Sequence, residues 1–172
     1  MHDFQPYPIE VLEFNPFTKL SNEWAAIVTE ADGKINAMTA SWGGLGIIWG
    51  KNACTIYIRD SRYTKELLDN SDTFSVCFLG EGKKHSTLQY LGKASGRDED
   101  KIAAAGLDIN YHKDVAFLDT ADFVIICKKM AATPIREEDF VDPSIKETYY
   151  SGKEEGNMHT MYIGEILEIL AR

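Results

Sequence analysis

The sequence predicts a mostly β fold, a β-barrel of about six antiparallel strands with short flanking helices. Six segments have the length and residue types of strands, whereas the helical patterns between them are short. No repeat, low-complexity tract or linker interrupts the 172 residues, so we expect residues 1–172 to form a single domain. Strands in one small domain bury their apolar faces by closing on one another, with helices covering the ends.

The first two strands are expected at Trp24–Thr29 and Lys34–Trp42. Asp32 and Gly33 between them form a two-residue hairpin signal, because both residue types tolerate a positive φ. The second strand contains small and polar residues, which are unusual in a core strand and suit the approach of a ligand to the backbone. We expect the next residues, Gly43–Gly46, to be flexible.

The middle of the chain alternates strands with short helices. Strands are expected at Ala53–Arg59 and Thr73–Leu79, and Ser61 is placed to cap a helix over 62–70 that joins them. A second helix is expected over Lys84–Lys93. Residues 95–98 have the spacing of a capping box for a third helix, over 99–105, which Gly106 would end. Long β-rich runs at Ala121–Met130 and Met158–Leu170 complete the predicted barrel.

Composition and charge exclude several classes of protein. A formal net charge of −9 makes nucleic acid a poor partner, because phosphate backbones are bound by concentrated positive charge. No apolar run approaches the ~20 residues of a membrane helix, and the N-terminus lacks the pattern of a secretory signal, so a cytoplasmic location is expected. Cys54, Cys77 and Cys127 stand singly in apolar segments, which predicts buried thiols, and no ligand spacing points to a metal.

One junction has the features of an anion site. A strand is expected to end at Arg59 and a helix to start near Ser61, which would bring free backbone amides, two guanidinium groups and the Thr64 hydroxyl together. The alternative is that Arg59 pairs with Asp60 or another surface carboxylate while Arg62 is solvated. Residues 95–101 have a similar alternative, a capped helix on whose exposed face Lys101 pairs with the neighbouring Glu99 or Asp100.

Three segments together resemble the flavin reductase family of FMN-binding split-barrel proteins, which includes flavoredoxin-like electron carriers. They are N-A-M-T-A-S-W-G at 36–43, R-x-x-R-Y-T at 59–64 and S-G-R-D-x-D-K at 95–101. The resemblance extends through residues 23–129 and returns in H-T-M-Y-I-G-E at 159–165. Many relatives have proline where this chain has Asp60, which adds a negative charge near the expected phosphate site.

The resemblance implies a set of FMN-binding residues. The strand residues Asn36, Met38, Thr39, Ala40, Ser41 and Trp42 would lie along the isoalloxazine ring. The phosphate and ribityl chain would contact Arg59, Arg62, Tyr63 and Thr64. The pocket would be closed by Ser95, Gly96, Arg97 and Lys101. His159 matches a family position that approaches the ring or the hydride donor, and the alternative is a hydrogen-bonded barrel histidine.

The resemblance also implies a function. We expect an FMN-binding oxidoreductase, an NADH- or NADPH-dependent flavin reductase that passes electrons to free flavin, a ferric complex or a partner protein. Because the flavin carries the chemistry, no side-chain nucleophile is needed. A homodimer with the flavin near its interface is implied as well. The alternatives are a non-enzymatic FMN electron carrier or sensor of the flavoredoxin type, and a relative that holds haem or another planar ligand.

Overall fold

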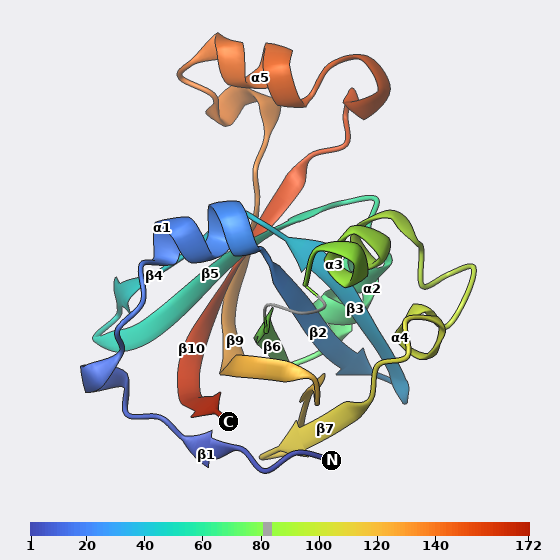
Figure 1. Cartoon of the computed structure of the whole chain (residues 1–172). Coiled ribbons are helices and arrows are strands. Elements are labelled where there is room, and N and C mark those ends of the chain that lie inside the picture. Colours follow the sequence, from blue (N-terminus) through green and yellow to red (C-terminus); the bar gives the residue numbers. More distant parts are fainter. Residues whose placement is uncertain (81–83) are drawn as a thin grey trace.

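The computed structural model describes residues 1–80 and 84–172 and shows one coiled antiparallel sheet with short helices around it (Figure 1). The strand order is β3-β2-β6-β9-β10-β5-β4, and β1 pairs with β10. These strands are β1 (Gln5–Pro6), β2 (Ala25–Ala31), β3 (Lys34–Ala40), β4 (Gly43–Ile48), β5 (Lys51–Arg59), β6 (Thr73–Leu79), β9 (Ala121–Pro134) and β10 (His159–Ala171). A separate hairpin joins β7 (Ile109–His112) to β8 (Val115–Leu118).

The mostly β prediction is confirmed, and each of the six expected strands is present, but the sheet formed by the described residues has eight strands, because it also contains β1 and β4, which were not predicted. The hairpin between β2 and β3 turns at Asp32 and Gly33, whose φ angles are 51° and 71°. The prediction of a flexible Gly43–Gly46 is wrong, because these residues begin β4 and pair with β5. A Cβ at Gly43 would lie 2.6 Å from the Thr55 carbonyl oxygen, so this glycine permits close pairing of the two strands.

The helices differ from expectation mainly at their first residues. Arg62, not Ser61, is the N-cap of α2 (Tyr63–Asn70), and the Ser61 amide donates to Asn157 Oδ1 at 3.1 Å. The expected capping box at Ser95 is also wrong, because α4 (Lys101–Ala104) is capped by the Asp100 carboxylate. The prediction of α3 (Lys84–Lys93) is confirmed. Gly106, with a φ of 64°, follows α4 closely as expected.

Two apolar clusters lie on the two faces of the sheet. Alternate residues of β2 divide between them, because successive side chains of a strand point to opposite faces. Ala26 and Val28 pack with α3 and β8, whereas Ala25 and Ile27 pack in the barrel interior. The three cysteines are buried free thiols, as predicted. Within the described ranges, no helix is both long and apolar enough to cross a bilayer.

Two peripheral segments shape the site. The first lies before β2, where η1 (Ile9–Val11) is followed by α1 (Pro16–Thr18) and the π-helical turn η2 (Lys19–Glu23). The second, called the arm here, comprises residues 135–158 between β9 and β10 and projects from the barrel (Figure 1). The arm contains η3 (Glu137–Asp139), α5 (Pro143–Tyr149) and η4 (Gly152–Glu154). The Ile135 amide donates to the His159 carbonyl at 2.9 Å, which joins the two ends of the arm.

Candidate functional site

A cleft forms where the ends of β3 and β5 meet the start of α2. Its volume is about 220 Å³. We call it the cationic cleft, and its lining residues are Met38, Thr39, Ala40, Ser41, Trp42, Tyr57, Arg59, Arg62 and His159. The fold therefore brings the predicted ring-binding strand and the two predicted arginines to one place. The sequence prediction did not include Tyr57, although this residue lies two positions before Arg59 and therefore on the same face of β5.

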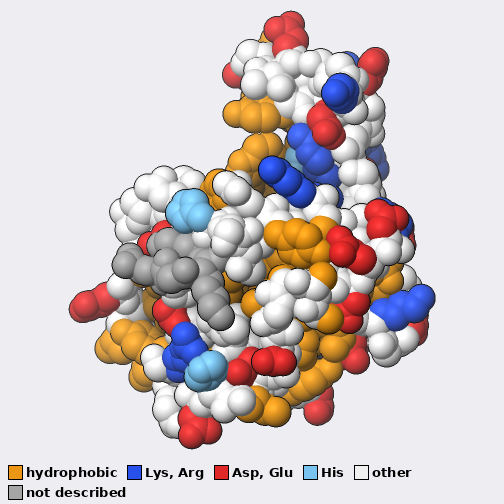
Figure 2. All heavy atoms as spheres, turned by 45° about the vertical axis from the view of Figure 1, so that its right-hand side comes forward, with side chains coloured by type: hydrophobic (Ala, Val, Ile, Leu, Met, Phe, Trp, Pro, Cys, Tyr) orange, Lys and Arg blue, Asp and Glu red, His pale blue; other side chains and the backbone are white. Residues whose placement is uncertain are grey.

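Arg59 joins the cleft to the arm. Its guanidinium donates to the Asn157 carbonyl at 2.8 Å and to the Tyr149 carbonyl at 3.1 Å, and it lies 3.3 Å from the Glu154 carboxylate. Lys and Arg side chains gather at the base of the arm (Figure 2). Asp60 instead accepts a hydrogen bond from the Thr160 hydroxyl at 3.1 Å. Of the partners considered for Arg59, the structure shows a carboxylate of the arm, not Asp60.

Arg62 is half-buried, not solvated as the alternative proposed. It donates to the Gly92 carbonyl at 2.7 Å and to the Leu91 carbonyl at 3.4 Å, at the C-terminus of α3. Helix C-termini attract cations, because their last carbonyls lack intrahelical partners. Burial lowers the pKa of the Arg62 guanidinium, which still keeps its charge at neutral pH. The cleft thus contains a positive charge held in place by the helix.

Lys101 reinforces the same helix end from outside the cleft lining. Its ammonium donates to the Leu91 carbonyl at 2.9 Å and to the Ala94 carbonyl at 3.1 Å, and the residue is 2% exposed. Burial, together with the nearby Arg62 charge, lowers the pKa of Lys101 to about 8. The alternative in which Lys101 lies on an exposed helix face is wrong, because its ammonium caps the carbonyl end of α3.

The other predicted residues form a layer beside the cleft. Asn36 donates to the Thr64 hydroxyl at 2.8 Å, and both side chains are buried. A Cβ at Gly96 would lie 2.3 Å from Asn36 Oδ1 and 2.7 Å from a ring carbon of Tyr63, so the loop packs directly on them.

The loop before α4 is fixed from the α2 side. The exposed Arg97 guanidinium binds the Glu66 carboxylate and donates to the Ser61 carbonyl at 3.0 Å. The Ser95 hydroxyl accepts from the Arg97 amide at 3.2 Å. These contacts fix the start of α2, whose first amides lie beside the arginines.

His159 lies between the cleft and the arm. One ring nitrogen, Nδ1, lies 2.7 Å from the Tyr150 hydroxyl, so His159 is hydrogen-bonded and also lines the cationic cleft. The His159 ring is also 5.0 Å from the Trp42 ring, measured between centroids. Burial and the nearby Arg59 charge lower the pKa of His159 to about 4, so the imidazole is neutral at pH 7. The sequence prediction did not include Tyr150, because only tertiary folding brings this part of the arm back to His159.

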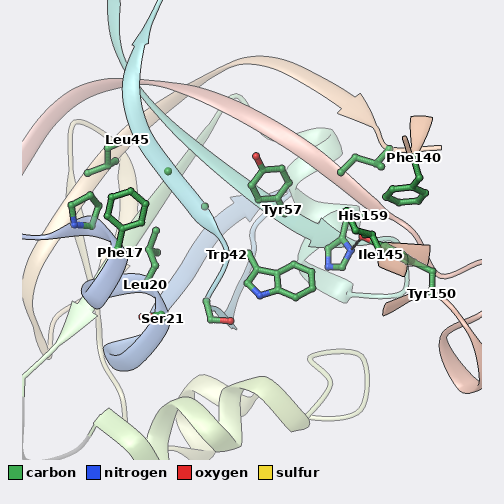
Figure 3. A pocket seen from close by; sticks show the side chains of 15 residues that line it. Phe17, Leu20, Ser21, Trp42, Leu45, Tyr57, Phe140, Ile145, Tyr150 and His159 are labelled. Atoms are coloured by element: carbon green, nitrogen blue, oxygen red, sulfur yellow. Dashed lines mark hydrogen bonds between the residues drawn. The ribbon is translucent and has the colours of Figure 1, made fainter. Parts of the chain in front are cut away.

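A second, larger cavity adjoins the cleft (Figure 3). Its volume is about 550 Å³, and it shares Ser41, Trp42, Tyr57 and His159 with the cationic cleft. We call it the apolar cavity. Its remaining lining residues are Pro16, Phe17, Leu20, Ser21, Gly43, Gly44, Leu45, Ile135, Phe140, Ile145 and Tyr150.

The two volumes suggest one extended site. Ligand pockets commonly have volumes of roughly 300–1,000 Å³, so the cleft of about 220 Å³ is too small to enclose a cofactor-sized ligand alone. A ligand anchored at the arginines would extend toward the shared residues and the apolar cavity. The arrangement therefore suits a molecule with an anionic group at one end and a flat ring at the other. In the part of the chain that the structure describes, no group of three or more His, Cys, Asp or Glu side chains is placed to hold a metal ion.

Comparisons with known proteins concern the domain family and the fold. The model of the flavin reductase like domain matches residues 19–172. A flavoredoxin from Methanosarcina acetivorans has a similar structure, with a TM-score of 0.66 at 17% identity over 87% of this chain and 68% of that one. An FMN-binding domain of a flavin reductases-like enzyme from Shewanella baltica has a TM-score of 0.69 at 14% identity, over 98% and 77% of the respective chains.

An enzyme is also among the similar structures. The NADH:FAD oxidoreductase of Streptomyces globisporus has a TM-score of 0.62 at 13% identity, over 87% of this chain and 75% of that one. At these identities the structural likeness establishes the fold, and the split-barrel prediction is confirmed. No curated protein sequence matches this chain significantly.

Proposed function

We propose, since this chain belongs to the family of flavin reductase-like domains, that it binds FMN with the phosphate end in the cationic cleft, and that it passes electrons from NADH or NADPH to a further acceptor. One observation carries the proposal. The segment Met38–Trp42, at the end of β3, and the guanidinium groups of Arg59 and Arg62 line one cleft.

The phosphate end of FMN fits the donors of the cleft. Arg59 and Arg62 each present a guanidinium whose five N–H donors exceed the two hydrogen bonds it makes to carbonyls. The first turn of α2 adds backbone amides without intrahelical acceptors, and a helix N-terminus favours an anion. Local positive charge therefore supports binding of a phosphate to a chain whose formal net charge is −9.

The ring end of FMN fits the residues shared by the two cavities. Thr39 and Ser41 flank Ala40, so this edge offers backbone groups and small side chains to a flat ring. Trp42 and Tyr57 add aromatic surface. When bound, FMN supplies hydride acceptance and transfer of one or two electrons. The residues of the chain orient it, and His159 places a neutral imidazole beside the site.

The proposal includes a homodimer. Large apolar side chains are exposed at Ile47 and Trp49, where β4 turns into β5, with exposed fractions of 72% and 63%. Clusters of exposed apolar residues commonly mark association surfaces, and identical chains most often pair with twofold symmetry.

The test begins with the visible spectrum of the purified protein. We expect an oxidised flavin spectrum, or uptake of added FMN measured by fluorescence titration. Without air, NADH or NADPH should then bleach the bound flavin. A colourless protein that takes up no FMN would contradict the proposal, and a haem spectrum would support another planar ligand instead.

The likeness to a flavoredoxin favours one alternative, a non-enzymatic FMN electron carrier. The same anaerobic reduction experiment distinguishes the two functions. If both nicotinamides leave the flavin oxidised while a reduced electron-transfer protein bleaches it, the carrier function is correct. As a control for damaged protein, FMN is removed from one preparation and then added back, and the reduction is measured again.

A further inference from the structure

The apolar cavity has two facing hydrophobic walls and an aromatic centre (Figure 3). One wall consists of Phe17, Leu20 and Leu45, from α1, η2 and β4. The facing wall consists of Phe140, Ile145 and Tyr150, from the arm. Trp42 and Tyr57 lie between the walls. A volume of about 550 Å³ is within the usual range for small-molecule sites.

The polar groups of this cavity are few and uncharged. Among the described residues, its lining contains no Asp, Glu, Lys or Arg. The Ser41 hydroxyl and the second ring nitrogen of His159 can orient a ligand, whereas the Ser21 hydroxyl already donates to Asn22 Oδ1 at 2.9 Å. An anionic ligand would lose its hydration here without gaining a charged partner, whereas a flat neutral ring would contact aromatic side chains.

We propose that the apolar cavity is the acceptor site of the protein, and that the acceptor is an uncharged, planar, largely apolar ring compound with a reducible group, such as a quinone. This inference rests on the proposed function, which supplies the electrons. The reaction is balanced when NADH or NADPH and one proton from solvent convert the quinone to its hydroquinone and leave the oxidised nicotinamide. The two electrons and two protons are all accounted for.

The depth of the cavity favours a small molecule over a second protein chain as the occupant. The cavity reaches Tyr150 and His159, which are each 5% exposed, whereas Phe17 lies at its rim with 82% exposed. A cavity of about 550 Å³ that reaches buried side chains has the size for a ring compound, whereas protein–protein contacts cover broader surfaces. Sharing four residues with the cationic cleft also puts the occupant beside the proposed flavin site.

The test measures binding separately from reduction. Coumarin, a neutral planar ring, and coumarin-3-carboxylate, its anionic counterpart, are titrated into the full chain by calorimetry, with and without FMN. We expect coumarin to bind about tenfold or more tightly than the carboxylate. It should also inhibit reduction of 1,4-benzoquinone competitively.

The arm provides a matched pair of variants. Ile145 lines the cavity and is 40% exposed, whereas Val141 lies outside the lining and is 99% exposed. Ile145→Glu should weaken coumarin binding by about tenfold, and Val141→Glu should change it by less than about twofold. Phe17→Glu places the same charge at the facing wall and is expected to act like Ile145→Glu.

The inference is overturned if the carboxylate binds as tightly as coumarin, or if coumarin binding is insensitive to both wall variants. It is also overturned if wild-type protein binds no coumarin while sedimentation shows that Ile145→Glu and Phe17→Glu each dissociate a dimer. In that case the cavity is a contact between chains. FMN uptake is measured in parallel, so a failure of the proposed function is seen as lost flavin binding, whereas coumarin binding to flavin-free protein still tests the cavity.

Discussion

Replacement of Arg62 by alanine tests the phosphate end of the proposed site. The guanidinium lines the cationic cleft while two of its donors hold the Gly92 and Leu91 carbonyls at 2.7 and 3.4 Å. A charge-assisted hydrogen bond to phosphate contributes about 1.5 to 3 kcal/mol, and each factor of ten corresponds to about 1.4 kcal/mol. Arg62→Ala should therefore weaken FMN by about 10- to 150-fold but riboflavin, which has no phosphate, by about twofold or less.

Lys101→Met is the matched control for damage to α3. Lys101 donates to the same Leu91 carbonyl at 2.9 Å, but it does not line the cleft. Both variants should lower the free energy of unfolding by about 1 to 3 kcal/mol, because carbonyls at the end of α3 lose partners. Only Arg62→Ala should change the ratio of FMN to riboflavin affinity, measured by quenching of flavin fluorescence. Equal weakening of the two flavins by Arg62→Ala would refute the assignment of this guanidinium to phosphate.

Three further predictions concern the surroundings of the cleft. Arg59→Ala removes the hydrogen bonds that hold the arm, so chymotrypsin should cleave within residues 135–158 about tenfold faster, and an unchanged rate would contradict this role. Gly96→Ala puts a methyl group 2.3 Å from Asn36 Oδ1 and should cost about 1 to 3 kcal/mol in urea unfolding, whereas Gly46→Ala, with no atom within 4 Å, should be close to neutral. Because the pKa of His159 is lowered to about 4, protonation favours the unfolded chain, and the free energy of unfolding should fall by about 1 to 2 kcal/mol from pH 7 to pH 5. His159→Gln should lose that part of the pH dependence, and an identical pH profile would show that His159 does not cause it.

The strands were predictable because their pattern is local, whereas the missed elements depend on distant contacts. The alternating side chains of β5 and the apolar run of β6 can each be recognised within one segment. By contrast, β4 begins with glycines, and its pairing depends on how closely Gly43 can approach Thr55. Helix starts were displaced for a similar reason. Ser61 has a cap-forming side chain, but its amide is held by Asn157 from the arm.

Sequence reasoning predicted which residues lie at the candidate site better than it predicted the role of each residue. The sequence motifs indicate which segments matter, and the fold brings two of these segments into one cleft. The role of Lys101 could not be predicted from its motif, because its ammonium is bound by carbonyls of α3. Tyr150 gave no signal at all, since a tyrosine nine residues before His159 contacts it only when the arm folds back.

Arg59 explains why the cleft and the arm are best treated as one unit. Its guanidinium lines the proposed phosphate site, yet two of its donors hold carbonyls at Tyr149 and Asn157 on the arm. The same arm supplies Phe140, Ile145 and Tyr150 to the apolar cavity. A phosphate bound at this guanidinium would share it with the arm, so binding at the cleft and the position of the far wall are coupled through one side chain. Arm cleavage should therefore become slower when FMN is added, because an additional anion fixes Arg59 in place.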